Sequence, residues 1–242
     1  GPDSLVIITI IVFILLVSGA FAVLDKSGIL KSLLGKIVTK FGGRKYVLLL
    51  VISFVFMFLG AFFGLFEEIV PLVPLMIALA YSLGWDAMVG LGMSILATNM
   101  GFSAAITNPF TIGVAQKLAD LPLFSGWQFR IPIFLAVYVL TAWFLLAYAR
   151  KIDRKPEASL TFGEDQADRK RYKSLTFKSD NANLGRAGLF FGFFVLLIVL
   201  VLVGTQFVEF LADYSLPLVG LLFFIGGLGA GIVSGAKGKL LG

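Results

Sequence analysis

The chain has 242 residues, of which 59% are hydrophobic and only 14% are charged, and its mean hydropathy is +0.98. Soluble domains carry about 25% charged residues, so this chain has too little charge to cover its own surface and we expect lipid to be its solvent. The absence of Cys and His excludes disulfides, thiolate nucleophiles, His-based metal sites and serine–histidine triads. In a membrane protein, a net charge of +6 usually comes from basic residues in the cytoplasmic loops. Because the basic segments lack interleaved aromatic residues, no nucleic-acid partner is expected.

The first predicted domain, residues 3–45, combines a membrane helix with an interfacial helix. Residues 5–24 are an uninterrupted apolar run, long enough to cross about 30 Å of hydrocarbon at about 1.5 Å per residue. Residues 27–40 place apolar side chains on one helical face and lysines on the other, which predicts an amphipathic helix in the plane of the interface. With Arg44 and Lys45, these lysines indicate the cytoplasmic side.

Two adjacent acids interrupt the next apolar region. Residues 46–66 can cross the membrane, but after Glu67 and Glu68 only the short apolar piece 72–83 follows. Twelve residues make about 18 Å of helix, which is too short to cross. The sequence therefore predicts a re-entrant helical hairpin over residues 46–83.

A broken helix is predicted to follow the hairpin. Residues 88–100 form a second short apolar helix, residues 104–108 interrupt it, and a new helix begins at Pro109. Short, interrupted hydrophobic segments are the best sequence indication of a transporter binding site. We therefore expect residues 46–120 to be the transport region, with the broken crossing at 87–120.

A return crossing and a basic linker complete this half of the chain. Residues 131–149, within a predicted segment 121–150, are long and apolar enough to cross, and the polar, basic segment 151–185 is expected to be a cytoplasmic linker. Only two basic residues, Lys117 and Arg130, lie between Lys45 and Arg150. A hairpin, one broken crossing and one return crossing keep both ends on the cytoplasmic side.

The last predicted segment, 186–242, holds two more crossings. Residues 189–208 and 215–235 are apolar, and lysines then return the chain to the cytoplasm. Gly227 and Gly231 form a small-xxx-small pattern, which indicates close helix packing.

Glu67 and Glu68 are the first part of a candidate site. An ionised carboxylate at membrane depth costs several kcal/mol unless it is paired or hydrated, so such acids usually face a cavity or an ion path. At a hairpin tip they would neutralise Na⁺, H⁺ or the cationic group of a substrate. The alternative is that residues 46–66 span fully and leave both acids in an external loop.

The second part of the candidate site is the helix start at Asn108 and Pro109. Asn is a strong N-cap and Pro is favoured at the first helical position. The partial positive charge and free N–H groups of such a start attract an anion, for which a carboxylate is the natural guest. The alternative is a proline kink in an ordinary helix. Hydroxyl and amide groups lie close in sequence, namely Asn99, Ser103, Thr107 and Thr111.

These residues carry a resemblance to a known family. Gly64 to Pro71 with Glu67 and Glu68, the Gly84-Trp85-Asp86 turn, and Asn108-Pro109-Phe110 resemble the four-carbon dicarboxylate carrier (DcuC-like) family of the ion transporter superfamily, and within it the YfcC branch of basic amino acid antiporters. Two positions depart from that branch, because Ile69 stands where Thr is usual and Thr107 where Ile is common. The hydroxyl at Thr107 resembles the Ser-Asn-Thr ion motif of the superfamily, which gives a candidate ion site of Asn99, Thr107 and Asn108.

The resemblance implies an all-α integral membrane protein with an inverted-repeat ion transporter fold, of which this chain covers about half. It further implies a homodimer and an elevator-type movement. The substrate site is expected to contain Glu67, Glu68, Ser103, Thr107, Asn108 and Pro109.

The sequence thus predicts a multi-pass protein of the inner membrane that moves a solute without converting it. The favoured function is secondary active transport of amino acids, basic ones in particular, whose carboxylate and ammonium groups match the two parts of the site. A four-carbon dicarboxylate carrier and an ion channel are the alternatives, and an enzyme is not expected. No cofactor is expected beyond a coupling Na⁺ or H⁺, and the sequence leaves the substrate, the coupling ion and the direction of exchange open.

Overall fold

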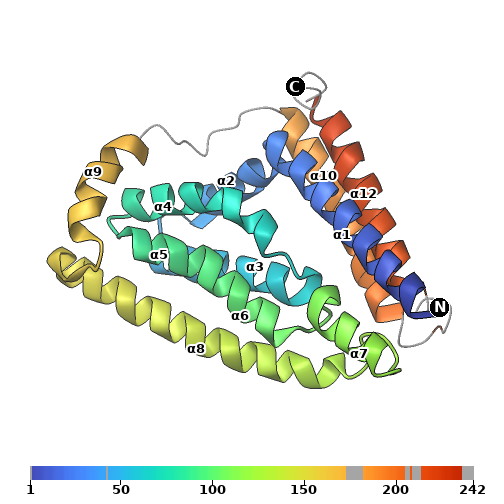
Figure 1. Cartoon of the computed structure of the whole chain (residues 1–242). Coiled ribbons are helices and arrows are strands. Elements are labelled where there is room, and N and C mark those ends of the chain that lie inside the picture. Colours follow the sequence, from blue (N-terminus) through green and yellow to red (C-terminus); the bar gives the residue numbers. More distant parts are fainter. Residues whose placement is uncertain (1, 42, 173–181, 205–207, 209–213, 236–242) are drawn as a thin grey trace. The chain divides into compact units, whose positions relative to one another are not determined.

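The computed structural model describes residues 2–41, 43–172, 182–204, 208 and 214–235, and within them every regular element is a helix (Figure 1). This agrees with the predicted all-helical class. The chain divides into two compact units. The first unit contains Gly1–Gly35, Ala115–Ser125 and Lys178–Gly242, and the second contains Lys36–Val114 and Gly126–Phe177.

Three long helices dominate the first unit. Helix α12 (Ser215–Val233) packs against both α1 (Pro2–Lys26) and α10 (Ala182–Gly204). A Cβ added at Gly227 would lie 2.6 Å from the Cβ of Ala20, so the small residues noted in the sequence permit this close approach.

The amphipathic helix is α2 (Ile29–Phe41). Ile29 and Leu34 are buried whereas Lys36 and Lys40 are exposed. The predicted separation of an apolar and a basic face is therefore present in the folded chain.

The second unit begins with a helical hairpin. Helix α3 (Lys45–Phe63) ends at Gly64, and the chain returns through the 3₁₀ helix η1 (Glu67–Leu72) and α4 (Val73–Ser82). The two ends of the hairpin meet, because the Trp85 ring lies 5.9 Å from the Tyr46 ring and 5.4 Å from Lys45 Nζ. The tip of the hairpin is therefore the segment between Gly64 and η1.

The broken helix follows. Helices α5 (Ala87–Leu91), η2 (Gly92–Leu96) and α6 (Ala97–Ala104) are continuous, and η3 (Pro109–Gly113) and α7 (Val114–Leu118) follow after residues 105–108. Both η2 and η3 are π-helical, a local geometry that is frequent at functional sites.

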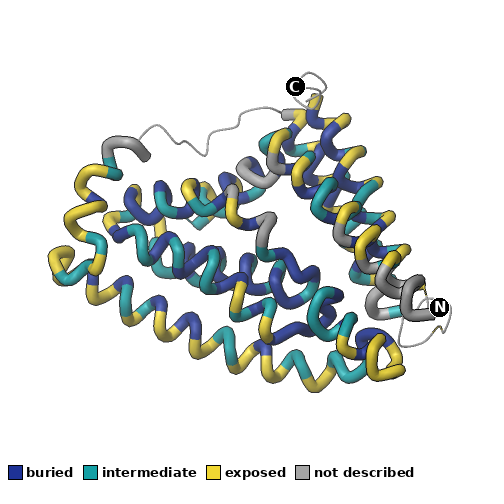
Figure 2. The backbone as a smooth tube through the Cα atoms, in the orientation of Figure 1, coloured by how far each residue is buried: buried dark blue, intermediate teal, exposed yellow. Residues whose placement is uncertain are grey.

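Helix α3 contacts α6, η2 and α8 (Trp127–Arg154) of the second unit, and nine of its residues are buried (Figure 2). Glycines bring it against α6, because a Cβ at Gly101 would lie only 1.9 Å from the Met57 carbonyl oxygen and one at Gly60 would lie 2.2 Å from that of Thr98. At the contact between α8 and α3, the Tyr138 hydroxyl donates to the Leu50 carbonyl at 3.0 Å.

The segment after α8 differs from the expected linker. Helix α8 continues to Arg154, and η4 (Pro156–Ala158) and α9 (Phe162–Tyr172) follow it. Helix α9 contacts α4, whereas residues 173–181 of the predicted linker lie outside the described residues. Local polarity alone did not indicate this docking.

Four helical stretches of the described residues are long and apolar enough to cross a membrane, namely Lys45–Phe63, Ala87–Leu118, Trp127–Arg154 and Asn183–Val201. Shorter apolar helices are Ile11–Leu24, Val73–Ser82 and Pro217–Val233. The membrane class predicted from composition is therefore supported by the lengths of the helices.

Candidate functional site

Asn108 joins the two halves of the broken helix. Its Oδ1 accepts hydrogen bonds from the backbone N–H groups of Phe110, at 2.9 Å, and Thr111, at 3.3 Å. Its Nδ2 donates to the Phe102 carbonyl at 3.2 Å, near the end of α6. Asn108 is completely buried, so it is the predicted N-cap and also a brace across the break.

The break lies directly against the hairpin tip. The backbone N–H of Thr107 donates to the Ala61 carbonyl at 3.2 Å, and the Thr107 hydroxyl donates to the Phe62 carbonyl at 3.0 Å. A Cβ at Gly64 would lie 2.3 Å from Asn108 Oδ1. The hairpin tip and the helix break are thus neighbours, although they are separated by about 40 residues of sequence.

Glu67 and Glu68 open η1, three residues after Gly64. Their backbone therefore continues from the tip that contacts Asn108. Their side chains lie outside the described part of the chain. The contacts with the break come from residues 61, 62 and 64 of the tip, and the acidic pair follows them in sequence.

A cation contacts the break from a third element. The Nε of Arg130, in the first turn of α8, donates to the Ile106 carbonyl at 3.0 Å. Ile106 is buried and Arg130 is half-buried. In the sequence, Arg130 was used only to predict topology. It could have been recognised as a candidate site residue because only Lys117 and Arg130 are basic between Lys45 and Arg150.

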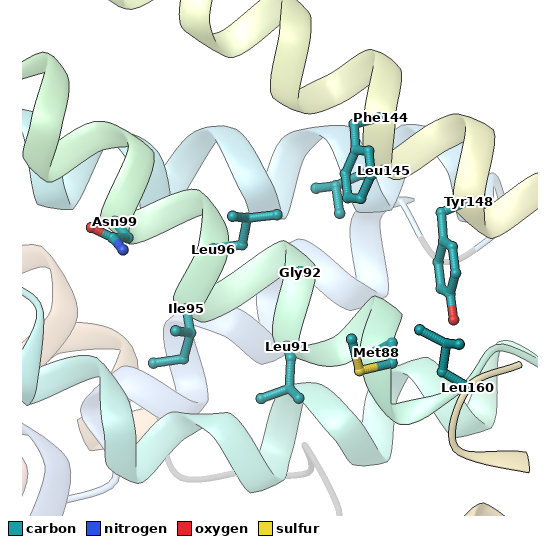
Figure 3. Close-up of a pocket in the computed structure, with 10 residues that line it drawn as sticks. All are labelled: Met88, Leu91, Gly92, Ile95, Leu96, Asn99, Phe144, Leu145, Tyr148 and Leu160. Carbon is teal, nitrogen blue, oxygen red and sulfur yellow. The ribbon is translucent and has the colours of Figure 1, made fainter.

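Ser103 and Asn99 lie on a different face of α6 from the tip contact. Both are exposed, whereas the neighbouring Thr98 is buried against Gly60 of α3. Asn99 lies at one end of an apolar groove of about 440 Å³ between α5–α6 and α8, with Tyr148 and Leu160 at the other end (Figure 3). Of the hydrogen bonds in the part of the chain that the structure describes, none joins Asn99 or Ser103 to the break.

The helix start at Pro109 has fewer open donors than the sequence suggested. The N–H groups of Phe110 and Thr111 are bonded to Asn108 Oδ1, and the N–H of Gly113 donates to the Asn108 carbonyl at 3.1 Å. In contrast, the buried Thr111 Oγ1 has no hydrogen-bond partner among the described residues. An anion at this start would therefore compete with the cap for the same donors.

A second polar cluster lies at the other end of the hairpin. Asp86 accepts from the hydroxyls of Tyr148, at 2.7 Å, and Ser159, at 2.8 Å, while Asp165 accepts from Tyr81 at 2.8 Å. Both carboxylates are buried. We call these five residues the polar clasp, because they join α4, α5, α8 and the segment 156–172.

The arrangement at the break defines a class of protein. A broken helix that packs against a helical hairpin in an apolar chain is the arrangement by which secondary carriers expose backbone groups to a solute. Among the described residues no group of three or more acidic side chains could hold a metal ion.

Comparison with known proteins agrees with this class and specifies it. Residues 4–240 match the family described as DcuC, C4-dicarboxylate anaerobic carrier. The chain therefore belongs to the DcuC family of membrane carriers, and it is not an enzyme.

Two curated relatives are similar to the chain. A protein of Escherichia coli (strain K12) with the name "Putative basic amino acid antiporter YfcC" is 28% identical over 165 residues, which is 66% of this chain and 33% of the relative. An uncharacterized protein of Haemophilus influenzae (strain ATCC 51907 / DSM 11121 / KW20 / Rd) is 28% identical over 158 residues, which is 65% and 31% of the two chains. The chain thus matches about a third of the length of each relative, and no solved structure matches it.

Proposed function

We propose that the protein is a secondary active transporter of amino acids, basic ones in particular, in the inner membrane. The observation that carries the proposal is the contact between the hairpin tip and the helix break, where Gly64 lies against Asn108 and an acidic pair follows. The name of the relative from Escherichia coli adds support for the substrate class.

The chemistry of the proposed site is dipolar. Glu67 and Glu68 would attract the cationic groups of the substrate, while the break formed by Thr107, Asn108 and Pro109 would hold the region of its carboxylate. Ser103 stays a candidate substrate residue, reached only if α6 turns or a further segment approaches its exposed face.

The coupling ion is proposed to be Na⁺ or H⁺. Asn99, Thr107 and Asn108 were predicted as its ligands, and the buried Thr111 hydroxyl in η3 is a further oxygen close in sequence to Asn108. Oxygen ligands of this kind suit a hard cation.

A four-carbon dicarboxylate is the second candidate substrate. The description of the matching family favours it, and the guanidinium of Arg130 at the break supplies a charge that would attract a carboxylate. The two candidates differ in net charge, so one assay distinguishes them.

An elevator-type movement in a homodimer is the proposed mechanism. The second unit supports it, because its hairpin, broken helix and α8 are tied by direct contacts at the tip and at the polar clasp. Elements so joined would move together as one body.

Uptake into liposomes by the full-length protein tests the proposal. Radiolabelled arginine, ornithine and succinate are supplied in turn, with and without a Na⁺ or pH gradient. Saturable uptake of arginine or ornithine supports the proposed function. Uptake of succinate alone would select the dicarboxylate alternative, and flux that does not saturate would contradict carrier function.

A further inference from the structure

A substrate carboxylate at the break needs a positive charge to bind to, and the helix start at Pro109 supplies only part of that charge. Asn108 Oδ1 already occupies the N–H groups of Phe110 and Thr111. A carboxylate that bound there would have to displace a fully buried cap, which stabilises the helix start. A substrate carboxylate therefore requires another cationic group nearby.

Arg130 is placed to be that group. Its Nε holds the Ile106 carbonyl, and the next residue, Thr107, is bonded to the carbonyls of Ala61 and Phe62 at the hairpin tip. One continuous set of hydrogen bonds thus joins α8, the break and the tip. The positive charge of the Arg130 guanidinium therefore lies at the break, whatever other groups Arg130 contacts.

A simpler explanation would be that Arg130 only anchors the end of α8 at the membrane surface. An anchoring arginine extends its head group into water, whereas Arg130 is half-buried and bonds to the carbonyl of a buried residue. Lys117 offers the contrast within the same region, because it is basic and exposed. Basic residues held inside a membrane protein usually mark a substrate or ion path.

We infer that Arg130 is the cationic member of the substrate site, where it binds the carboxylate of the substrate and fixes the carbonyl of Ile106. This inference rests on the proposed function. The charged residues of the proposed site are Glu67, Glu68 and Arg130, and with both acids ionised and before a coupling ion binds their charges sum to −1. The complementary substrate carries a net charge of +1, as arginine and ornithine do, and not the −2 of a four-carbon dicarboxylate.

The size of the effect follows from the strength of hydrogen bonds to charged groups. Such bonds contribute about 1.5–3 kcal/mol, which is about a 10- to 150-fold change in affinity. Arg130→Gln should weaken arginine binding by this factor. It should scarcely change the binding of agmatine, which is arginine without its carboxylate.

The test measures the KM for arginine uptake and the inhibition of that uptake by agmatine in proteoliposomes that contain the full-length protein. The variants are R130Q, R130K and the control K117Q. The expected result is that the preference for arginine over agmatine falls at least 10-fold in R130Q, is largely retained in R130K because the charge remains, and is unchanged in K117Q. Thermal unfolding of each purified variant identifies any that do not fold.

Several results would overturn the inference. If R130Q weakens both compounds equally, or weakens neither, Arg130 does not bind the carboxylate. If folded R130K loses the preference as completely as R130Q, charge is not what the site requires, which keeps the test decisive even when R130Q fails to fold. If the wild type takes up neither arginine nor ornithine, the proposed function itself fails, and the inference fails with it.

Discussion

Gly64 is the residue on which the contact between tip and break depends most closely. Its φ of +69° lies in the left-handed region, which costs other residues about 1–2 kcal/mol. Its missing side chain also makes room for Asn108, since a Cβ there would lie 2.3 Å from Oδ1. Conformation and space therefore both require glycine at this position.

We predict that Gly64→Ala lowers transport and stability more than Gly84→Ala. Gly84 has a similar φ of +87° but nothing within 4 Å of an added Cβ, so the pair separates the clash from the backbone strain. The clash should add about 1–3 kcal/mol. Thermal unfolding in detergent and uptake in liposomes measure the two effects; equal losses in both variants would show that Asn108 tolerates a closer neighbour.

Asn108 gives a second prediction at the residue scale. Asn108→Ala removes the cap and the bond to Phe102, and should weaken substrate binding about 2- to 30-fold if the cap energy of about 0.5–2 kcal/mol passes wholly into binding. Asn108→Asp keeps the acceptor and adds a negative charge, so it should weaken a bound carboxylate further but strengthen a cation site.

The control for Asn108 is Gln128→Ala, an exposed amide in the first turn of α8. Substrate affinity and ion dependence of uptake are measured for all three variants. Weaker substrate binding in the Asp variant than in the Ala variant indicates a carboxylate guest, and a stronger ion dependence indicates Na⁺ or H⁺. Unchanged affinity in both Asn108 variants would mean that the break is a structural kink.

Single residues were predictable where their chemistry is local. The cap at Asn108 and the helix start at Pro109 follow from a dipeptide, and the structure places both as predicted. The partners of Thr107, Gly64 and Arg130 lie 24 to 46 residues away in sequence. Such contacts depend on how helices pack, which local preferences do not encode.

At the scale of the elements, α9 shows how a polar segment can be fixed in place. It offers little apolar surface, and its docking depends on Asp165, Arg169 and the polar clasp. Arg169 donates to the Trp85 carbonyl at 2.7 Å and lies 4.9 Å from the centre of the Tyr81 ring. The helix therefore depends on a few buried hydrogen bonds for its position.

We predict that Asp165→Ala releases α9 whereas Asp168→Ala does not. The first change leaves the buried Tyr81 hydroxyl without its acceptor, at a cost of about 1–3 kcal/mol. Asp168 is a less buried acid on the same helix. Hydrogen exchange should accelerate in residues 81–87 and 156–172 of D165A alone, and equal protection in both variants would show that the clasp does not hold the helix.

The helices themselves were largely predictable from apolar runs, and the break followed from its flanking caps. The continuous helix from α5 to α6 ends at Ala104, where the sequence placed the interruption. The ends of α8 and α10 were harder to predict, because polar residues there continue helices that the apolar pattern does not mark. Helices η4 and α9 were not predicted for the same reason.

At the scale of the whole molecule, the contacts of the second unit give a consistent path for the chain. Lys45 at the start of α3 forms an ion pair with Asp153 near the end of α8 at 2.5 Å, and Trp85 lies beside Lys45. The start of α3, the end of α4 and the end of α8 are thus at one end of this unit. Membership of the DcuC family then makes this path part of a membrane carrier.

The proposed function requires that the acidic tip and the helix break form one transport site. It is tested most directly by saturable arginine uptake in proteoliposomes with the double variant Glu67→Gln and Glu68→Gln, compared with the wild type. The control is Glu157→Gln with Glu164→Gln, two exposed acids of the segment after α8.

The tip variant should fold and insert normally but lose uptake, because the cationic group of the substrate loses its counter-charge, while the control should transport as the wild type does. Normal saturable uptake by the tip variant would mean that the acidic tip and the helix break do not form one transport site, and would place Glu67 and Glu68 in an external loop.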